Sequence, residues 1–139
     1  MQATRLFLLS VLLVMFVTGC DSLHYTQYVV SNASPTDRAA IKKTVVSSAA
    51  AAGLVDKTET SKVPDTIAFY LEPVPHFPVS LGARMVQDSA FVDLSCFHPG
   101  VAKPQAFRSA ESNLTATLTR EFGAQLTMPD HSHRVPITR

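Results

Sequence analysis

Cys96 and His98 are the residues of this 139-residue chain whose types and spacing first suggest covalent chemistry. A nucleophilic thiol needs a base within hydrogen-bond reach and a third group that orients the base. Two positions apart on a strand, the side chains would share a face at about 7 Å, too far for direct contact without a bend, which Pro99 could supply. The alternative is a buried cysteine at a strand end followed by a loop histidine. We favour this alternative, so the sequence predicts a protein that is not an enzyme.

His131 and His133 resemble a fragment of a metal site near the C-terminus. Alternating histidines can converge on copper, nickel or zinc, and His98, His76 or Asp130 could complete the set. Two histidines in a polar tail are also common as plain surface residues. We therefore expect no cofactor, and we keep His98, His131 and His133 as weak candidate metal ligands.

The segment from Glu72 to Pro78 is the best candidate for a contact with a partner, because prolines alternate with other residues along it. Proline has no backbone donor, so the segment cannot belong to a central strand. Val74, His76 and Phe77 would be held on a stiff backbone that loses little entropy on docking. The alternative is a rigid connector with Phe77 in the core.

Charged residues on the predicted sheet give no acid–base pair. Arg84 is either an exposed sheet residue or a contact for an anion, and Asp88 and Asp93 bracket a predicted hairpin at no spacing that specifies acid–base work. The chain also has no glycine-rich phosphate loop and no Gly-x-Ser-x-Gly motif.

The N-terminus carries the pattern of an export signal. Arg5 precedes an apolar run from Leu6 to Val17, whose length falls within the roughly 7–15 residues of a signal-peptide core. A membrane-spanning helix needs about 20 apolar residues, so this run is too short to span a bilayer comfortably. It ends in Val17, Thr18, Gly19 and Cys20, an aliphatic residue and two small residues before a cysteine.

This ending resembles the lipobox of bacterial lipoproteins. The resemblance covers residues 1–20 and implies a diacylglycerol on the Cys20 thiol, cleavage before Cys20, and acylation of the new N-terminus with a fatty acid such as palmitate. Asp21 resembles the signal that retains enterobacterial lipoproteins in the inner membrane. Two alternatives are an uncleaved anchor helix and an ordinary signal peptide in which Cys20 is incidental.

Removal of the predicted signal peptide, residues 1–19, leaves 120 residues, enough for one domain with a real core. We assign this single α+β domain to residues 20–128 and a loose tail to residues 129–139.

Arg5 is the one charged residue removed, so the mature chain carries eleven basic and eleven acidic residues. That balance predicts no nucleic-acid partner. With Cys20 lipidated, Cys96 has no partner for a disulfide, which favours its burial.

Hydrophobic alternation and helix-capping residues predict the elements of the domain. Strands are expected at 23–30, 66–71, 79–86, 90–97 and 124–128, and helices at about 35–52 and 105–122. Ser34 and Gly53 would cap the first helix, and Gln87, Asp88 and Ser89 would turn a hairpin. The order β-α-β-β-β-α-β predicts an antiparallel or mixed sheet with two helices on one face, a ferredoxin-like arrangement.

The function predicted from these features is that of a membrane-anchored lipoprotein, non-enzymatic, that takes part in interaction or assembly in the cell envelope. Its partners would be the membrane, through Cys20, and an envelope protein. The domain would lie in the periplasm, and Asp21 favours the inner membrane over the outer one. The alternative is a tethered module that binds a small ligand or a metal.

Overall fold

The computed structural model describes residues 21–73, 78–99 and 102–129 of the chain. Several predictions fall on residues outside these ranges: the signal peptide with Val17, Thr18, Gly19 and Cys20, the loop residues Val74, His76 and Phe77, and the tail histidines His131 and His133.

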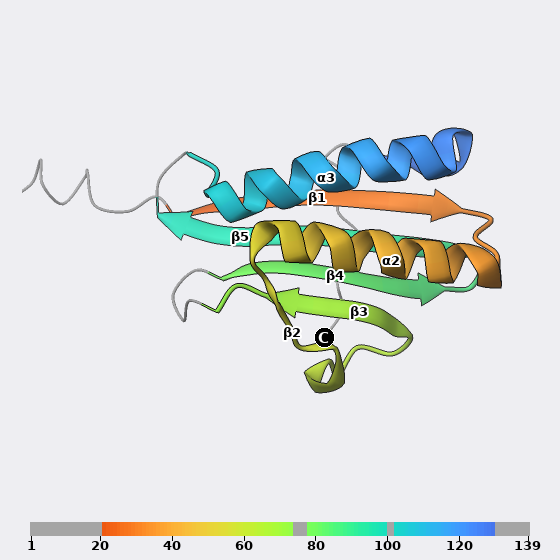
Figure 1. Cartoon of the computed structure of the whole chain (residues 1–139), viewed down its shortest axis with the longest axis horizontal. Coiled ribbons are helices and arrows are strands. Elements are labelled where there is room, and N and C mark those ends of the chain that lie inside the picture. Colours follow the sequence, from red (N-terminus) through yellow and green to blue (C-terminus); the bar gives the residue numbers. More distant parts are fainter. Residues whose placement is uncertain (1–20, 74–77, 100–101, 130–139) are drawn as a thin grey trace, which may run out of the picture.

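The described chain forms one open antiparallel sheet with two long helices on one of its faces (Figure 1). The strands are β1 (Asp21–Ser31), β2 (Val55–Asp56), β3 (Thr66–Leu71), β4 (Val79–Val86), β5 (Ser89–Pro99) and β6 (Leu126–Thr127). Their order across the sheet is β2-β3-β4-β5-β1-β6. The helices are α2 (Pro35–Ala52) and α3 (Gln105–Phe122), and the short 3₁₀ turns η1 (Thr58–Thr60) and η2 (Gly123–Gln125) complete the chain. The predicted α+β class is confirmed, and the arrangement is consistent with a ferredoxin-like fold.

The capping residues explain where α2 begins and ends. Ser34 precedes the helix and accepts a hydrogen bond from the Asp37 backbone N–H (3.2 Å), while the Asp37 carboxylate accepts one from the Ser34 N–H (2.6 Å). This reciprocal pair satisfies two donors that the first turn leaves free. Gly53 ends the helix in a left-handed conformation with φ 72°, which costs glycine little. The predicted bounds of this helix are therefore confirmed.

The structure corrects several predicted strand boundaries. β1 covers Asp21–Ser31 instead of 23–30, and β5 continues to Pro99 instead of ending at 97, so His98 lies in a strand and not in a loop. Two further boundaries were wrong for local reasons. Gly123 starts a 3₁₀ turn that includes Ala124 and Gln125, so the last strand begins only at Leu126 instead of Ala124. In the β4–β5 hairpin, Ser89 pairs with Val86 and belongs to the strand, which leaves a turn of two residues. The short β2, which was not among the predicted strands, pairs with the end of β3, Val55 opposite Leu71 and Asp56 opposite Tyr70.

Strand alternation places the core between the sheet and the two helices. The buried apolar side chains come from β1, β3, β4 and β5 on one side and from α2 and α3 on the other. Those that are fully inaccessible are Tyr28, Val30, Ile41, Val45, Ala49, Val79, Leu81, Ala90, Val92, Leu94, Phe107, Ala110, Leu114 and Leu118. Among the described helices, none is both long and apolar enough to cross a membrane.

Tyr28 is a large polar residue within this core. Its hydroxyl lies 2.8 Å from Thr115 Oγ1 and donates to the Glu111 backbone carbonyl at 3.2 Å, so its polar end is satisfied against α3. Burial raises the pKa of the Tyr28 hydroxyl above its ordinary value. The side chain therefore stays neutral in the core and joins β1 to α3.

We predict that Leu114→Ala lowers the free energy of unfolding by about 2–5 kcal/mol, because it removes a fully buried side chain from the centre of α3 and leaves a cavity. Urea denaturation followed by circular dichroism measures the change. Val46→Ala on α2 is the matched control, since Val46 is 40% exposed and should lose less than about 1 kcal/mol. Equal losses in the two variants would contradict the core described above.

Candidate functional site: a hollow on the open face of the sheet

The face of the sheet opposite the helices, here called the open face, carries the second set of alternating side chains. The registers align Gln27, Asp93, Gly82 and Phe69 in one row across β1, β5, β4 and β3. The next row contains Tyr25, Ser95, Ser80 and Leu71. The small residues Gly82, Ser80 and Ser95 thus stand in the middle of these rows, with larger residues beside them.

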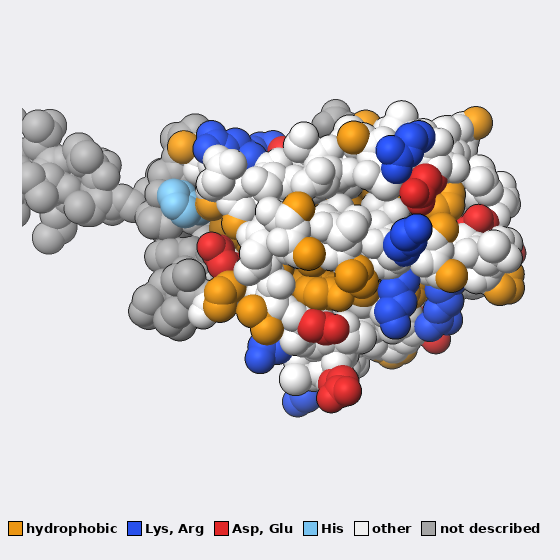
Figure 2. Space-filling view, in the orientation of Figure 1, with side chains coloured by type: hydrophobic (Ala, Val, Ile, Leu, Met, Phe, Trp, Pro, Cys, Tyr) orange, Lys and Arg blue, Asp and Glu red, His pale blue; other side chains and the backbone are white. Residues whose placement is uncertain are grey.

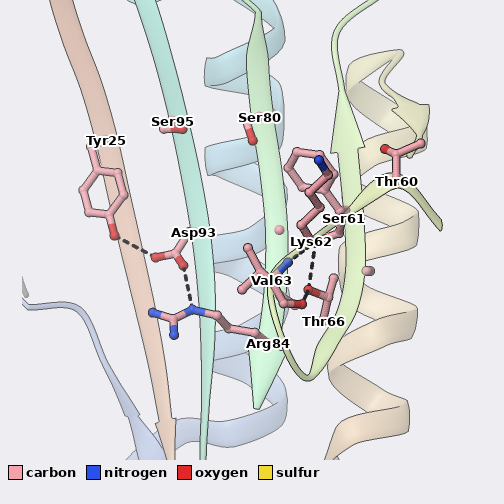
Figure 3. A pocket seen from close by; sticks show the side chains of 14 residues that line it. Tyr25, Thr60, Ser61, Lys62, Val63, Thr66, Ser80, Arg84, Asp93 and Ser95 are labelled. Atoms are coloured by element: carbon pink, nitrogen blue, oxygen red, sulfur yellow. Dashed lines mark hydrogen bonds and ion pairs between the residues drawn. The ribbon is translucent and has the colours of Figure 1, made fainter. Parts of the chain in front are cut away.

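A hollow of about 320 Å³ lies over these small residues, and we call it the open-face hollow. Its lining residues are Tyr25, Thr60, Ser61, Lys62, Val63, Thr66, Ala68, Phe69, Ser80, Gly82, Ala83, Arg84, Asp93 and Ser95 (Figure 3). Gly82 creates the depression because it places no side chain between Asp93 and Phe69. A Cβ at Gly82 would lie 3.4 Å from Phe69 Cδ2, an ordinary contact, so the strand itself does not require glycine there.

The segment from η1 to β3 forms one wall of the open-face hollow and is fixed by its own hydrogen bonds. The Thr66 hydroxyl donates to the Val63 carbonyl at 2.6 Å and lies 3.0 Å from Ser61 Oγ. The Met85 N–H donates to the Asp65 carbonyl at 3.2 Å, which ties this wall to β4. The hollow is therefore bounded by ordered chain on this side.

Asp93 organises the opposite wall (Figure 3). Its Oδ1 accepts hydrogen bonds from the Tyr25 hydroxyl and from Gln27 Nε2, both at 2.7 Å. Its Oδ2 lies 3.8 Å from Arg84 Nε. Arg84 also stacks over the Phe91 ring, with Cζ 5.0 Å from the ring centroid. These contacts hold the Asp93 carboxylate and the Arg84 guanidinium in place between β1, β5 and β4.

The hollow therefore combines apolar, hydroxyl and cationic groups. Phe69, Val63 and the backbone at Gly82 offer apolar contact, while Ser80 and Ser95 offer hydroxyls. Arg84 and Lys62 outnumber the carboxylate of Asp93 by one charge, so the lining is formally positive. An apolar group that carries a nearby carboxylate fits this chemistry.

A second hollow, of about 430 Å³, lies on the helix-bearing side, where Lys and Arg side chains gather near the start of α2 (Figure 2). Its lining includes Arg38 and Lys42 of α2 together with Thr58, Thr66 and Ile67. Arg38 and Lys42 are exposed and lie one turn apart on the helix, as expected for a solvated helix face.

The Cys96–His98 pair has the environment of a structural thiol. Cys96 is 1% exposed on the core side of β5, as predicted, and its Sγ donates to the Phe97 carbonyl at 3.3 Å. Burial raises the pKa of this thiol, and the Glu72 carboxylate adds to the effect. A nucleophile requires the opposite shift, toward the thiolate. This direction supports the non-catalytic interpretation of Cys96.

His24 is a residue that the sequence reasoning missed. It pairs with Cys96 across β1 and β5, and Ser22 pairs with His98, so both histidines lie on the same side of the sheet as the thiol. Within the described residues, His24 Nε2 and His98 Nδ1 have no hydrogen-bond partner. No group of three or more His, Cys, Asp or Glu side chains suited to a metal ion occurs in the described ranges.

The open-face hollow was also missed, although part of its signal was in the sequence. Arg84 was weighed as exposed or as an anion contact, and its side chain is in fact 28% exposed beside Asp93. Polar or small residues in the outer phase of β1, β4 and β5, such as Gln27, Ser80 and Ser95, mark part of the open face. Only the register of the strands, however, brings Tyr25, Asp93 and Gly82 to one place.

Comparisons of the chain with models of protein families, with curated proteins and with solved structures found no match.

We predict that Cys96 reacts with a thiol reagent such as DTNB at least tenfold more slowly in the native domain than in urea, because it is buried and its pKa is raised. Absorbance at neutral pH measures the rate on the domain without residues 1–20. Ser95→Cys in a Cys96→Ser background is the control, since position 95 lies on the open face and should react quickly. A fast reaction of Cys96 in the folded domain would contradict its burial and would favour the hypothesis that Cys96 is a nucleophile.

Proposed function

We propose that this protein is a bacterial lipoprotein, anchored by acyl chains on Cys20, whose periplasmic domain binds an envelope protein through the open-face hollow and performs no catalysis. The observation that carries the proposal is the hollow itself. It is a formally positive depression on a sheet face that neither helix covers, with walls fixed by the Asp93 and Thr66 hydrogen bonds.

The start of β1 supports the anchoring part of the proposal. β1 begins at Asp21, directly after the candidate lipidated residue, and pairs with β5 from that residue onward, Asp21 opposite Pro99. An anchor on Cys20 would therefore connect to the sheet with no intervening linker. The domain would then lie against the membrane surface.

The chemistry of the hollow indicates the kind of partner. We propose an extended segment of an envelope protein that places an apolar side chain over Gly82 and a carboxylate near Arg84 and Lys62. Arg84 is already oriented by Asp93 and by the Phe91 ring, so it loses little freedom when it binds a carboxylate. Charge complementarity of this kind guides encounter and fixes register.

A tethered small-ligand module is the second candidate, and the volume of the hollow favours it. Small-molecule sites usually measure about 300–1,000 Å³, and the open-face hollow, at about 320 Å³, is at the lower end. Such a ligand would carry one carboxylate or phosphate on a small apolar body. Native mass spectrometry of protein purified under mild conditions distinguishes this candidate by a reproducible added mass.

We predict that the mature N-terminal peptide carries a diacylglyceryl group on Cys20 and that Cys20→Ala leaves an unprocessed precursor. Mass spectrometry of the purified protein and immunoblotting of membrane fractions measure both results in a bacterial host. Cys96→Ala is the matched control and should be processed normally. Normal cleavage of the Cys20→Ala chain would show that Cys20 is incidental to an ordinary signal peptide.

We predict that a photoreactive residue at position 80, within the hollow, forms a discrete crosslink to an envelope protein in cells. The same residue at position 46 lies on the exposed side of α2 and should form none. Gly82→Leu should reduce the position-80 crosslink at least fivefold by filling the hollow, whereas Gly82→Ala should keep it. Circular dichroism confirms that both variants fold. Equal yields of the position-80 crosslink in Gly82→Leu and Gly82→Ala would contradict docking in the hollow.

A further inference from the structure

Leu23 and Phe97 form an exposed apolar pair at one end of the open face. They are direct cross-strand partners in β1 and β5, and they are 37% and 57% exposed. Phe97 is the most exposed of the large hydrophobic residues in the described ranges. Apolar residues exposed singly are ordinary on a protein surface, whereas these two are contiguous across neighbouring strands.

The register explains why Phe97 is uncovered. The pairing of β4 with β5 ends at Val79 opposite Cys96, so Phe97 lies one residue beyond the start of β4. Leu23 flanks it on one side, and no β4 residue flanks it on the other. The pair therefore lies uncovered on the open face, at the end of the sheet at which β1 begins.

The extended backbone of β1 sets the distance from Asp21 to Leu23, two residues that span about 7 Å at a strand rise of about 3.4 Å per residue. Cys20 is bonded to Asp21, and consecutive Cα atoms are about 3.8 Å apart, so the Cα of Cys20 is at most about 11 Å from that of Leu23. Apolar faces of interfacial segments are buried about 5–10 Å into the boundary between headgroups and acyl chains. A lipidated Cys20 must lie at that boundary, so Leu23 and Phe97 lie within reach of it.

Charges of both signs lie near this end. Asp21 is paired with Pro99, and the Glu72 carboxylate accepts a hydrogen bond from the Val79 N–H at 3.4 Å. Lys103, at the start of α3, forms an ion pair with Glu111 at 2.8 Å, which leaves the two side chains formally neutral together. Lys103 also lies over the Phe107 ring, 5.3 Å from its centroid. Ser22 and His98, the neighbouring cross-strand pair, carry no carboxylate. The proposed anchor decides the occupant: with acyl chains on Cys20, a lipid surface is what the exposed pair of Leu23 and Phe97 would meet.

We propose that Leu23 and Phe97 form a membrane-contact patch that inserts into the bilayer interface beside the lipid anchor and orients the domain with its sheet end toward the lipid. The proposal rests on the lipidation of Cys20. It assigns a specific orientation to the domain: β1 rises from the surface, and the far end of the sheet, with the β4–β5 turn, points away from it.

Tryptophan fluorescence tests this orientation cleanly, because the chain contains no tryptophan of its own. The mature protein, lipidated at Cys20 and carrying Phe97→Trp, is reconstituted into phosphatidylethanolamine–phosphatidylglycerol vesicles with or without brominated acyl chains. Bromine quenches only indole groups that enter the bilayer. We expect at least twofold quenching and a blue-shifted emission for Phe97→Trp.

Val86→Trp is the matched control. Val86 is 43% exposed and lies at the opposite end of β4, in the same outward phase as Arg84, so its tryptophan should be quenched by less than 10%. Mass spectrometry shows, for each sample, whether Cys20 carries the lipid. A lipidated protein with Phe97→Trp unquenched, or with both tryptophans quenched alike, overturns the membrane-contact patch and leaves the proposed anchor intact. An unmodified Cys20 overturns the anchor and the patch together.

Discussion

The pairing of β1 with β5 is the constraint on which the rest of the structure depends. It runs without a register shift from Asp21 opposite Pro99 to Ser31 opposite Ser89 and joins the first described residues to the middle of the chain. Because side chains alternate along a strand, this register fixes which residues of both strands face the helices and which face the open side. A slip of one residue would place Asp93 in the core and Leu94 in solvent.

The side chains of β1 that face the helices are unusually polar, and residues of α3 contact them. His24, Thr26 and Tyr28 all point to the helix side, where an ordinary strand would present aliphatic groups. The Thr26 hydroxyl donates to Glu111 Oε1 at 2.7 Å, the Tyr28 hydroxyl meets Thr115, and the His24 ring packs 5.9 Å from the Phe107 ring. Buried hydroxyl groups need hydrogen-bond partners, so the contacts of Thr26 and Tyr28 specify how α3 lies on β1. The ring contact of His24 adds packing, not a hydrogen bond.

Much of the fold could be predicted from the sequence because its signals are local. Capping at Ser34 and Gly53, the helical spacing of Phe107, Leu114 and Leu118, and the alternation around Leu81 each act within a few residues. The site could not be predicted in this way. The open-face hollow depends on four strands brought together by register, and on Gly82, whose missing side chain matters only beside Phe69 and Asp93. The prediction that Cys96 is buried succeeded because strand phase alone decides it.

The place of β6 has a consequence for everything that follows it in the chain. β6 pairs with β1 at Val29 and Val30, not near its start, so the chain leaves the sheet at the end far from Asp21. Eight residues of strand separate Asp21 from Val29, a rise of about 27 Å at about 3.4 Å per residue. With Cys20 at a membrane, the sheet would act as a spacer, and the segment after Met128, with its two histidines, would start its path at that height above the lipid.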